Sequence, residues 1–304
     1  MNVAVSVAGA LREAARRLRA SGSRSPRLDA ELLLATALGV DRAELFRTPE
    51  RPLTPAEAER FDANLRRREA REPVAYIRGV RAFRTIELEV TPAVLIPRPE
   101  TETLVDVALE ALAAMSGPGG AAAPGLHEPL ALDVGTGSGC IALALAAEDP
   151  FVCVVAVDVD QAAVKVARRN AARLGLGGRV DITCGDLFAG LPPDRRFDVI
   201  VSNPPYIPAG EYEALEPNVR DYEPRLALHG GEDGLDVYRR LVPEAALCLR
   251  PGGTLAVEVG AGQAAAVRAL FAAAGAFAPA RERSDLGGIT RVVFATRVPE
   301  GSGG

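Results

Sequence analysis

LALDVGTGSGC, at residues 130–140, places a short apolar segment directly before three closely spaced glycines. Glycine tolerates positive φ and lets the backbone approach a ligand closely, and a helix that begins after such a turn points its N-terminal amides at that ligand. We therefore predict a strand at 130–134, a ligand-binding turn at 135–139 and a helix from Cys140. The spacing departs from the G-x-G-x-x-G dinucleotide motif, because Cys140 stands where the third glycine would be.

Short apolar segments continue to alternate with helical patterns beyond this turn. Such alternation indicates the α/β class, with a Rossmann-like, doubly wound and mostly parallel sheet. The further strands are expected at 152–157, 180–183, 197–201, 254–259 and 291–295, and the helices at 161–174, 237–249 and 263–274.

The N-terminal segment instead predicts a small bundle of short helices. Ser25 and Pro26 form a helix start, and Gly39 can end that helix. Thr54 and Glu57 have the spacing of a capping box at the start of a second helix.

The chain is accordingly divided into four parts. We expect a helical substrate-recognition domain at 1–72, a β-hairpin linker at 73–96, a large α/β domain at 97–298 that opens with a helix, and a flexible tail at 299–304. Within the large domain, the Gly-, Ala- and Pro-rich segment 116–129 is expected to be a flexible surface loop.

Composition excludes several kinds of chemistry. The chain has two histidines and four cysteines without a C-x-x-C pair, so neither a metal site nor a disulfide framework is expected. No uncharged apolar run reaches the roughly 18 residues that span a bilayer, and we expect a soluble, cytoplasmic monomer with no membrane partner. Residues 1–90 hold 17 Arg against 13 acidic residues, whereas the rest of the chain carries the excess of acid that makes the net charge −5.

Acidic residues follow the second and third expected strands. Asp158 stands 23 positions after Gly135, where a carboxylate can accept the hydroxyls of a ribose. Asp186 is placed to reach an adenine amino group, and Leu187 can pack on the base. Because ligands of open α/β sheets bind at the carboxyl ends of the strands, these residues indicate an adenosine-containing ligand. Asp160 is expected to cap the next helix.

Asn203-Pro204-Pro205-Tyr206 follows the strand expected at 197–201. Pro205 favours an extended conformation at the residue before it, so the Pro204 carbonyl and the Asn203 side-chain oxygen take fixed directions. Two fixed acceptors match a planar NH₂ group, which offers two donors in one plane. Tyr206 can stack on that group.

An amide nitrogen is a poor nucleophile, since its lone pair is delocalised into the carbonyl. Binding both of its hydrogens favours pyramidalisation and holds the nitrogen in line with an electrophilic methyl. Orientation of this kind is worth up to about 7–11 kcal/mol. The chemistry needs neither histidine nor cysteine.

The glycine turn, Asp158 and the Asn203 tetrapeptide together resemble class I S-adenosylmethionine-dependent methyltransferases that act on planar nitrogens. Further segments, at 73–79, 94–102, 222–228 and 230–235, are similar to those of the release factor glutamine methyltransferases (PrmC/HemK). The resemblance implies methylation of the side-chain amide nitrogen (N5) of the glutamine in the Gly-Gly-Gln motif of bacterial peptide chain release factors, with S-adenosylhomocysteine as product. It also implies cofactor contacts for Gly135, Thr136, Gly137, Ser138, Gly139, Asp158, Asp186, Leu187 and Asn203, and substrate contacts for Asn203, Pro204, Pro205 and Tyr206, of which Asn203, Pro204 and Tyr206 are catalytic.

Three alternatives stay open. An adenine or cytosine amino methyltransferase would bind the same flat NH₂ group, but the acidic balance of residues 91–304 disfavours a nucleic acid partner. Another protein, such as a ribosomal protein, could supply the glutamine. A non-catalytic adapter could bind the release factor through the helical domain, although the intact Asn203 tetrapeptide counts against it. The segment from Arg98 to Thr101 is expected to close over the methionine end of the cofactor.

Overall fold

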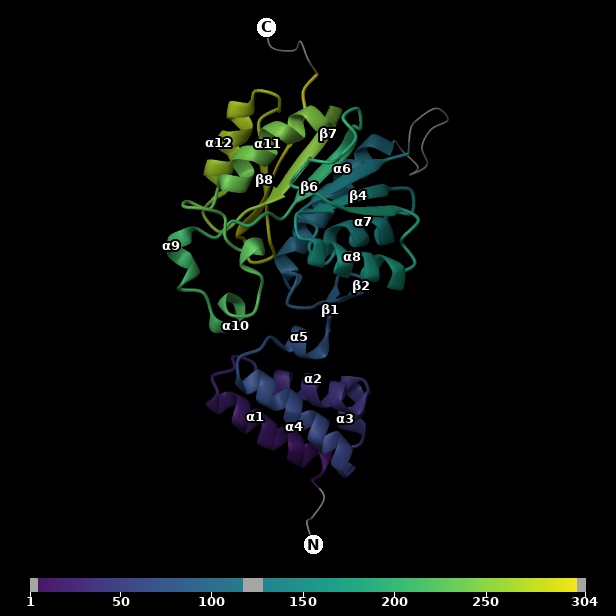
Figure 1. Ribbon diagram of the computed structural model, residues 1–304, viewed down its shortest axis with the longest axis vertical. Coiled ribbons are helices and arrows are strands. Elements are labelled where there is room, and N and C mark those ends of the chain that lie inside the picture. Colours follow the sequence, from purple (N-terminus) through teal and green to yellow (C-terminus); the bar gives the residue numbers. More distant parts are fainter. Residues whose placement is uncertain (1–4, 117–127, 300–304) are drawn as a thin grey trace. The chain divides into compact units, whose positions relative to one another are not determined.

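A sheet of seven strands forms the centre of the larger unit in a computed structural model, which describes residues 5–116 and 128–299 (Figure 1). Its strands run in the order β5-β4-β3-β6-β7-β9-β8. Strands β5, β4, β3, β6 and β7 are parallel, and β9 is antiparallel to β7 and β8. The strand bounds are β3 Leu130–Val134, β4 Cys153–Asp158, β5 Val180–Cys184, β6 Phe197–Ser202, β7 Leu249–Glu258, β8 Arg281–Ser284 and β9 Thr290–Thr296.

Successive strand residues point to opposite faces of this sheet. Apolar residues occupy both faces, and helices cover each of them. Ala131 belongs to one hydrophobic cluster and its neighbour Leu132 to another. The predicted doubly wound, mostly parallel sheet is thus confirmed. The first cluster takes in α6 Glu102–Ser116, α7 Cys140–Glu148 and α8 Gln161–Arg173, and the second takes in α11 Asp236–Cys248 and α12 Ala264–Ala274.

The sheet departs from the prediction at one edge. Strand β8 was not expected, since Arg281–Ser284 consists of polar and charged residues with no apolar alternation. It forms because its backbone pairs with β9, while its side chains stay largely exposed. Strand β7 also begins at Leu249, five residues before the expected start.

The smaller unit comprises Met1–Val80 together with Glu216–Tyr222. Its helices pack around buried apolar side chains such as Leu18, Leu33 and Phe61. The capping box predicted at Thr54 is present, and Gly39 ends the helix that begins at Pro26, with a φ of 69°. The helix bounds are α1 Val7–Ala20, α2 Pro26–Leu38, α3 Arg42–Arg47, α4 Pro55–Glu69 and α5 Val74–Arg78.

The hairpin expected over 73–96 is shorter than predicted. Val74–Arg78 is a helix, because Pro73 stands at its N-cap and Gly79 ends it at a φ of 74°. Tyr76 and Ile77 are its buried side chains. The hairpin itself consists of β1 Val80–Phe83 and β2 Ile86–Glu89.

The long connection from β6 to α11 contains two short helices, α9 Ala209–Tyr212 and α10 Pro217–Arg220, and the 3₁₀ turn η2 Arg225–Ala227. Its residues 216–222 belong to the smaller unit, where the Tyr222 hydroxyl donates to the Ala70 carbonyl at 2.6 Å. Arg24 forms an ion pair with Glu216 at 2.5 Å.

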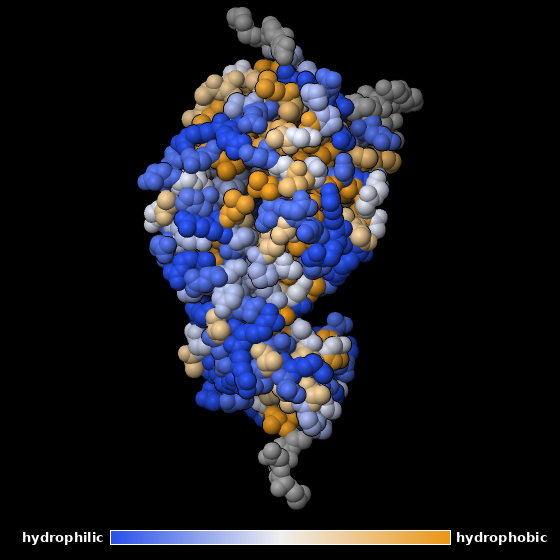
Figure 2. Space-filling view, in the orientation of Figure 1, coloured by the Kyte–Doolittle hydropathy of each residue, from blue (hydrophilic) through white to orange (hydrophobic). Residues whose placement is uncertain are grey.

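Hydrophilic residues cover much of the visible surface, with apolar residues in scattered groups (Figure 2). Among the described residues, no helix is long and apolar enough to cross a membrane. Most of the loop expected at 116–129 and of the tail expected at 299–304 lies outside the described residues.

Candidate active site

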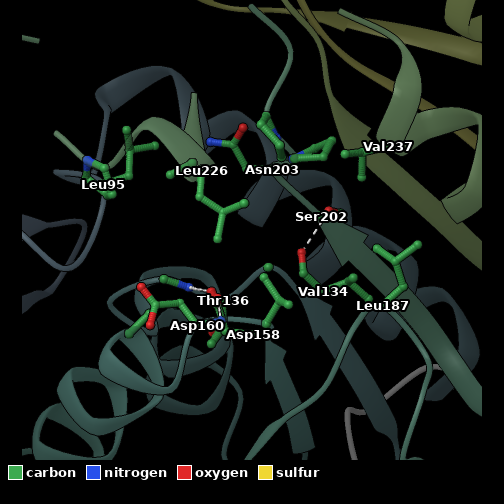
Figure 3. Close-up of a pocket in the computed structure, with 18 of the residues that line it drawn as sticks. Leu95, Val134, Thr136, Asp158, Asp160, Leu187, Ser202, Asn203, Leu226 and Val237 are labelled. Atoms are coloured by element: carbon green, nitrogen blue, oxygen red, sulfur yellow. Dashed lines mark hydrogen bonds between the residues drawn. The ribbon is translucent and has the colours of Figure 1, made fainter. Parts of the chain in front are cut away.

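A cavity of about 300 Å³ lies beyond the carboxyl ends of β3, β4, β5 and β6, in the larger unit. Strands β4 and β6 flank β3, so the strand order reverses at β3: β4 and β5 lie on one side of it, and β6 and β7 lie on the other. Open α/β sheets bind their ligands at such a switch point. The residues that line the cavity include most of those that the sequence analysis selected, and Figure 3 shows several of them.

The turn at 135–139, called the glycine loop below, forms the floor of the cavity. Gly135, Gly137 and Gly139 all have positive φ. A Cβ on Gly139 would meet only the end of the flexible Leu143 side chain at 2.9 Å, so it is the positive φ of this position that favours glycine. Gly135, Thr136, Gly137 and Ser138 line the cavity, whereas Gly139 is not among the lining residues.

Asp133 supports the glycine loop from beneath. Its Oδ2 accepts from the Thr136 hydroxyl at 2.6 Å and from the Ala142 amide at 3.2 Å. The side chain is fully buried, and this burial raises the pKa of the carboxyl to about 7. The sequence analysis assigned Asp133 no role, although its place at the end of a buried strand was a visible signal.

Asp158 lines the cavity and binds two backbone amides. Its Oδ2 accepts from the Gly137 amide at 2.8 Å, and its Oδ1 accepts from the Asp160 amide at 2.9 Å. Burial raises the pKa of this carboxyl. Each carboxylate oxygen keeps a further lone pair, so hydroxyl donors can still bind. Asp160 caps α8 as expected, since its side chain accepts from the Ala162 amide.

Asp186 and Leu187 line the cavity beyond β5. The Asp186 carboxylate accepts from Arg240 Nη2 at 2.9 Å, an ion pair that the sequence analysis did not anticipate. Leu187 has a φ of 53°, which is rare outside glycine, and its side chain packs against the second hydrophobic cluster.

Residues 203–206, called the acceptor loop below, begin where β6 ends. The Ser202 hydroxyl donates to the Val134 carbonyl at 2.7 Å and so joins this strand end to β3 (Figure 3). Asn203, Pro204 and Pro205 line the cavity. Asn203 Nδ2 donates to Thr101 Oγ1 at 3.2 Å, so this hydrogen bond uses the nitrogen of the side-chain amide and not its oxygen.

Tyr206 is not among the residues that line the cavity. Its ring is largely buried, and burial raises the pKa of its hydroxyl to about 12. Its carbonyl accepts from Gln263 Nε2 at 2.9 Å, and Gln263 Oε1 in turn accepts from the Gly260 amide. The stacking role expected for Tyr206 stays a prediction.

Two glycines approach the backbone of the acceptor loop closely. A Cβ on Gly230 would lie 2.7 Å from the Pro205 carbonyl oxygen, and one on Gly234 would lie 2.3 Å from the Tyr206 carbonyl oxygen. Sequence reasoning quoted both glycines without a role. The close approach of backbone to backbone explains why no side chain fits.

A segment on each side of the acceptor loop reaches the cavity. Leu95 and Leu226 project towards it (Figure 3), and Pro224 also lines it. Buried Glu223 joins these segments, because its carboxylate accepts from the Ile96 amide at 3.1 Å and from Arg98 Nη2 at 2.5 Å.

The site therefore combines an apolar cavity, a glycine loop, one carboxylate at the end of β4 and a proline-fixed amide at the end of β6. In the described part of the chain, no group of three or more His, Cys, Asp or Glu residues could hold a metal ion. This donor set fits S-adenosylmethionine, which presents two ribose hydroxyls, an apolar purine face and a charged methionine end.

Two family models match parts of this chain. The family model described as the PrmC N-terminal domain matches residues 9–79, and the methyltransferase small domain matches residues 123–217. The chain is 46% identical over 276 residues to a release factor glutamine methyltransferase of Geobacter sulfurreducens, with 91% of each chain covered. It is 45% identical to the protein of the same name from Moorella thermoacetica, covering 96% of this chain and 98% of the relative.

Solved structures share the fold. The catalytic domain of human METTL16, in complex with MAT2A 3′UTR hairpin 6, superposes with a TM-score of 0.53 at 15% identity and covers 70% of this chain and 77% of that chain.

Proposed function

This chain belongs to the release factor glutamine methyltransferase family, and on that premise we propose that it methylates the side-chain amide nitrogen of the glutamine in the Gly-Gly-Gln motif of bacterial peptide chain release factors. It is an S-adenosylmethionine-dependent enzyme. The observation that carries the proposal is the position of Asn203 and Pro204, which line the same cavity as the glycine loop and Asp158.

S-adenosylmethionine supplies the electrophilic methyl group when it is bound. We assign the ribose hydroxyls to Asp158 and the methionine end to the amides of the glycine loop. Leu187 packs on the adenine, and the ion pair of Asp186 with Arg240 places two polar groups at that end of the cavity. Leu95 and Leu226 exclude water from the other side.

The acceptor loop orients the glutamine. Asn203 Oδ1 and the Pro204 carbonyl accept the two hydrogens of the substrate NH₂ group, which places the nitrogen lone pair towards the methyl group. Bound S-adenosylmethionine would supply the methyl group and would leave as the thioether S-adenosylhomocysteine, while the proton that the amide nitrogen loses would pass to water. The chain contributes orientation and fixed acceptors, consistent with an active site without histidine.

The smaller unit is proposed to recognise the body of the release factor, and the protein is proposed to act as a monomer in the cytoplasm. The N-terminal family match at residues 9–79 supports a specialised role for this unit. The residues of this unit, 1–80 and 216–222, hold 16 Arg against 13 acidic residues, an excess that suits an acidic partner surface.

Transfer of a labelled methyl group to a panel of substrates tests the proposal. We expect label on a release factor and none on a ribosomal protein, DNA or RNA at the same concentration. A release factor whose Gly-Gly-Gln glutamine is replaced by alanine is the matched control and should stay unlabelled. Equal labelling of nucleic acid would contradict the proposal.

A further inference from the structure

Two buried residues outside the acceptor loop form a hydrogen-bonded chain with Asn203. Thr101, in the 3₁₀ turn η1 Pro99–Thr101, is 1% exposed, and Glu258, at the end of β7, is 2% exposed. Thr101 Oγ1 accepts from Asn203 Nδ2 at 3.2 Å. The Glu258 carboxyl lies within reach of the Thr101 hydroxyl, an interaction that lowers the pKa of this carboxyl. Neither residue lines the cavity.

The chemistry of the three side chains decides which group donates and which accepts in these hydrogen bonds. An ionised carboxylate can only accept, so the Thr101 hydroxyl must donate to Glu258. The lone pairs of Thr101 Oγ1 then accept, and the group that donates to them is the NH₂ of Asn203. The amide of Asn203 is thereby held in one of its two flip orientations, with Nδ2 towards Thr101 and Oδ1 free to accept from a substrate.

We propose that Thr101 and Glu258 are positioning residues that fix the orientation of the Asn203 amide for methyl transfer. This inference rests on the proposed function, because it requires Asn203 Oδ1 to accept a hydrogen of the substrate NH₂. Neither residue touches the reacting atoms.

Protonation of Glu258 reverses the direction of the hydrogen bonds that link Glu258, Thr101 and Asn203. A neutral carboxyl can donate to Thr101 Oγ1, which frees the Thr101 hydroxyl to donate to an amide oxygen and permits the flipped, unproductive Asn203. Burial raises the pKa of Glu258 to about 7, against the opposing effects of Thr101 and Arg291. The ionisable groups that face Glu258 are Arg291 of β9, Arg98 and Glu100 before α6, Tyr206 of the acceptor loop, Tyr238 of α11 and Cys140 of α7.

Substitution of Thr101 tests the hydroxyl. Thr101→Val keeps the shape but removes both hydrogen bonds, and we expect kcat to fall roughly 10- to 100-fold with KM for the release factor little changed. Thr101→Ser restores the hydroxyl and should recover most of kcat. Thr254→Val, a buried threonine of the same strand as Glu258, controls for the general cost of such a change. Unchanged kcat in Thr101→Val would overturn the proposal.

The pH profile tests the carboxylate. Wild-type kcat should rise as pH increases through about 7, because the ionised form of Glu258 fixes the productive orientation. The rise should vanish in Glu258→Gln, whose amide both donates and accepts, and kcat should stay below the wild-type plateau at alkaline pH. Asp133, whose pKa is also raised to about 7, is unchanged in this variant. If kcat of Glu258→Gln still rises with pH, the rise belongs to another group such as Asp133, and the proposal is overturned.

These outcomes are separable from failure of the proposed function. If the wild-type protein transfers no methyl to any release factor, the proposed function is wrong. If wild-type transfer is robust while Thr101→Val and Glu258→Gln match it at every pH, only the positioning role is wrong. Binding of S-adenosylmethionine, measured by calorimetry for each variant, confirms that the cavity is intact in these comparisons.

Discussion

The two ends of the Asn203 amide have different tasks: the nitrogen binds to the protein, and the oxygen is proposed to accept from the substrate. Its Nδ2 is held by Thr101, and the residue itself lines the cavity. Sequence alone identified Asn203, because the proline pair after it makes the local conformation predictable. Thr101 belongs to a segment that was expected near the cofactor, but neither its contact with Asn203 nor that of Glu258 with Thr101 could be predicted. The reason is that 102 and 55 positions separate Thr101 and Glu258 from Asn203, and only the folded sheet brings them together.

Replacement of Asn203 tests its role at the residue scale. Asn203→Ala removes one of the two acceptors for the substrate NH₂, and we expect kcat to fall by about 10²- to 10³-fold, as for loss of a group that stabilises the transition state. Binding of S-adenosylmethionine should persist, because the glycine loop and Asp158 are unchanged. Calorimetry for the cofactor and a single-turnover methyl transfer assay separate the two effects, and undiminished turnover would contradict the assignment.

The elements that carry the site were predictable where local patterns suffice. Strand β3, the glycine loop and the cap of α8 follow from apolar runs, glycine spacing and Asp160. Strand β8 was not predicted, since it depends on pairing with β9, which outweighs the local propensity of its polar residues. Helix α5 was not predicted either, because its apolar residues were interpreted as part of a strand, although Pro73 and Gly79 bound a short helix.

The glycines that approach the acceptor loop give an element-scale prediction. In Gly230→Ala, the added Cβ would meet the Pro205 carbonyl oxygen at 2.7 Å and the Tyr206 Cα at 2.8 Å, which are both backbone atoms. We expect the loop to shift, and kcat to fall at least tenfold while S-adenosylmethionine still binds. Gly210→Ala in α9 has no atom within 4 Å of its Cβ and serves as the matched control. Equal kcat in the two variants would show that the fit at Gly230 does not matter.

At the scale of the whole molecule, the chain contributes to its smaller unit twice. Met1–Val80 supplies the helices, and Glu216–Tyr222 is supplied by the connection between β6 and α11. The sequence indicated the helical bundle but not this return, because residues 216–222 carry no apolar periodicity. The connection that holds Gly230 and Gly234 beside the acceptor loop therefore also reaches the unit that we propose to recognise the substrate.

The Tyr222 hydroxyl tests this return. Tyr222→Phe removes the hydrogen bond to the Ala70 carbonyl and should lower the stability of the smaller unit by about 1 kcal/mol. We expect faster hydrogen exchange across residues 216–222 with little change across β3 and β6. Tyr238→Phe, which removes a hydroxyl hydrogen bond to the Glu258 carbonyl within the larger unit, is the control. Unaltered exchange in Tyr222→Phe would mean that this hydrogen bond does not hold the segment.

The central claim is that the acceptor loop presents a glutamine side-chain nitrogen for methylation. Tandem mass spectrometry of a release factor incubated with this protein and S-adenosylmethionine tests it most directly. We predict a single methyl group on the side-chain nitrogen of the Gly-Gly-Gln glutamine, formed about 10²- to 10³-fold more slowly when Asn203→Ala replaces the wild type. A methyl group on another residue, or an unmodified glutamine in the presence of active, cofactor-bound protein, would contradict the account.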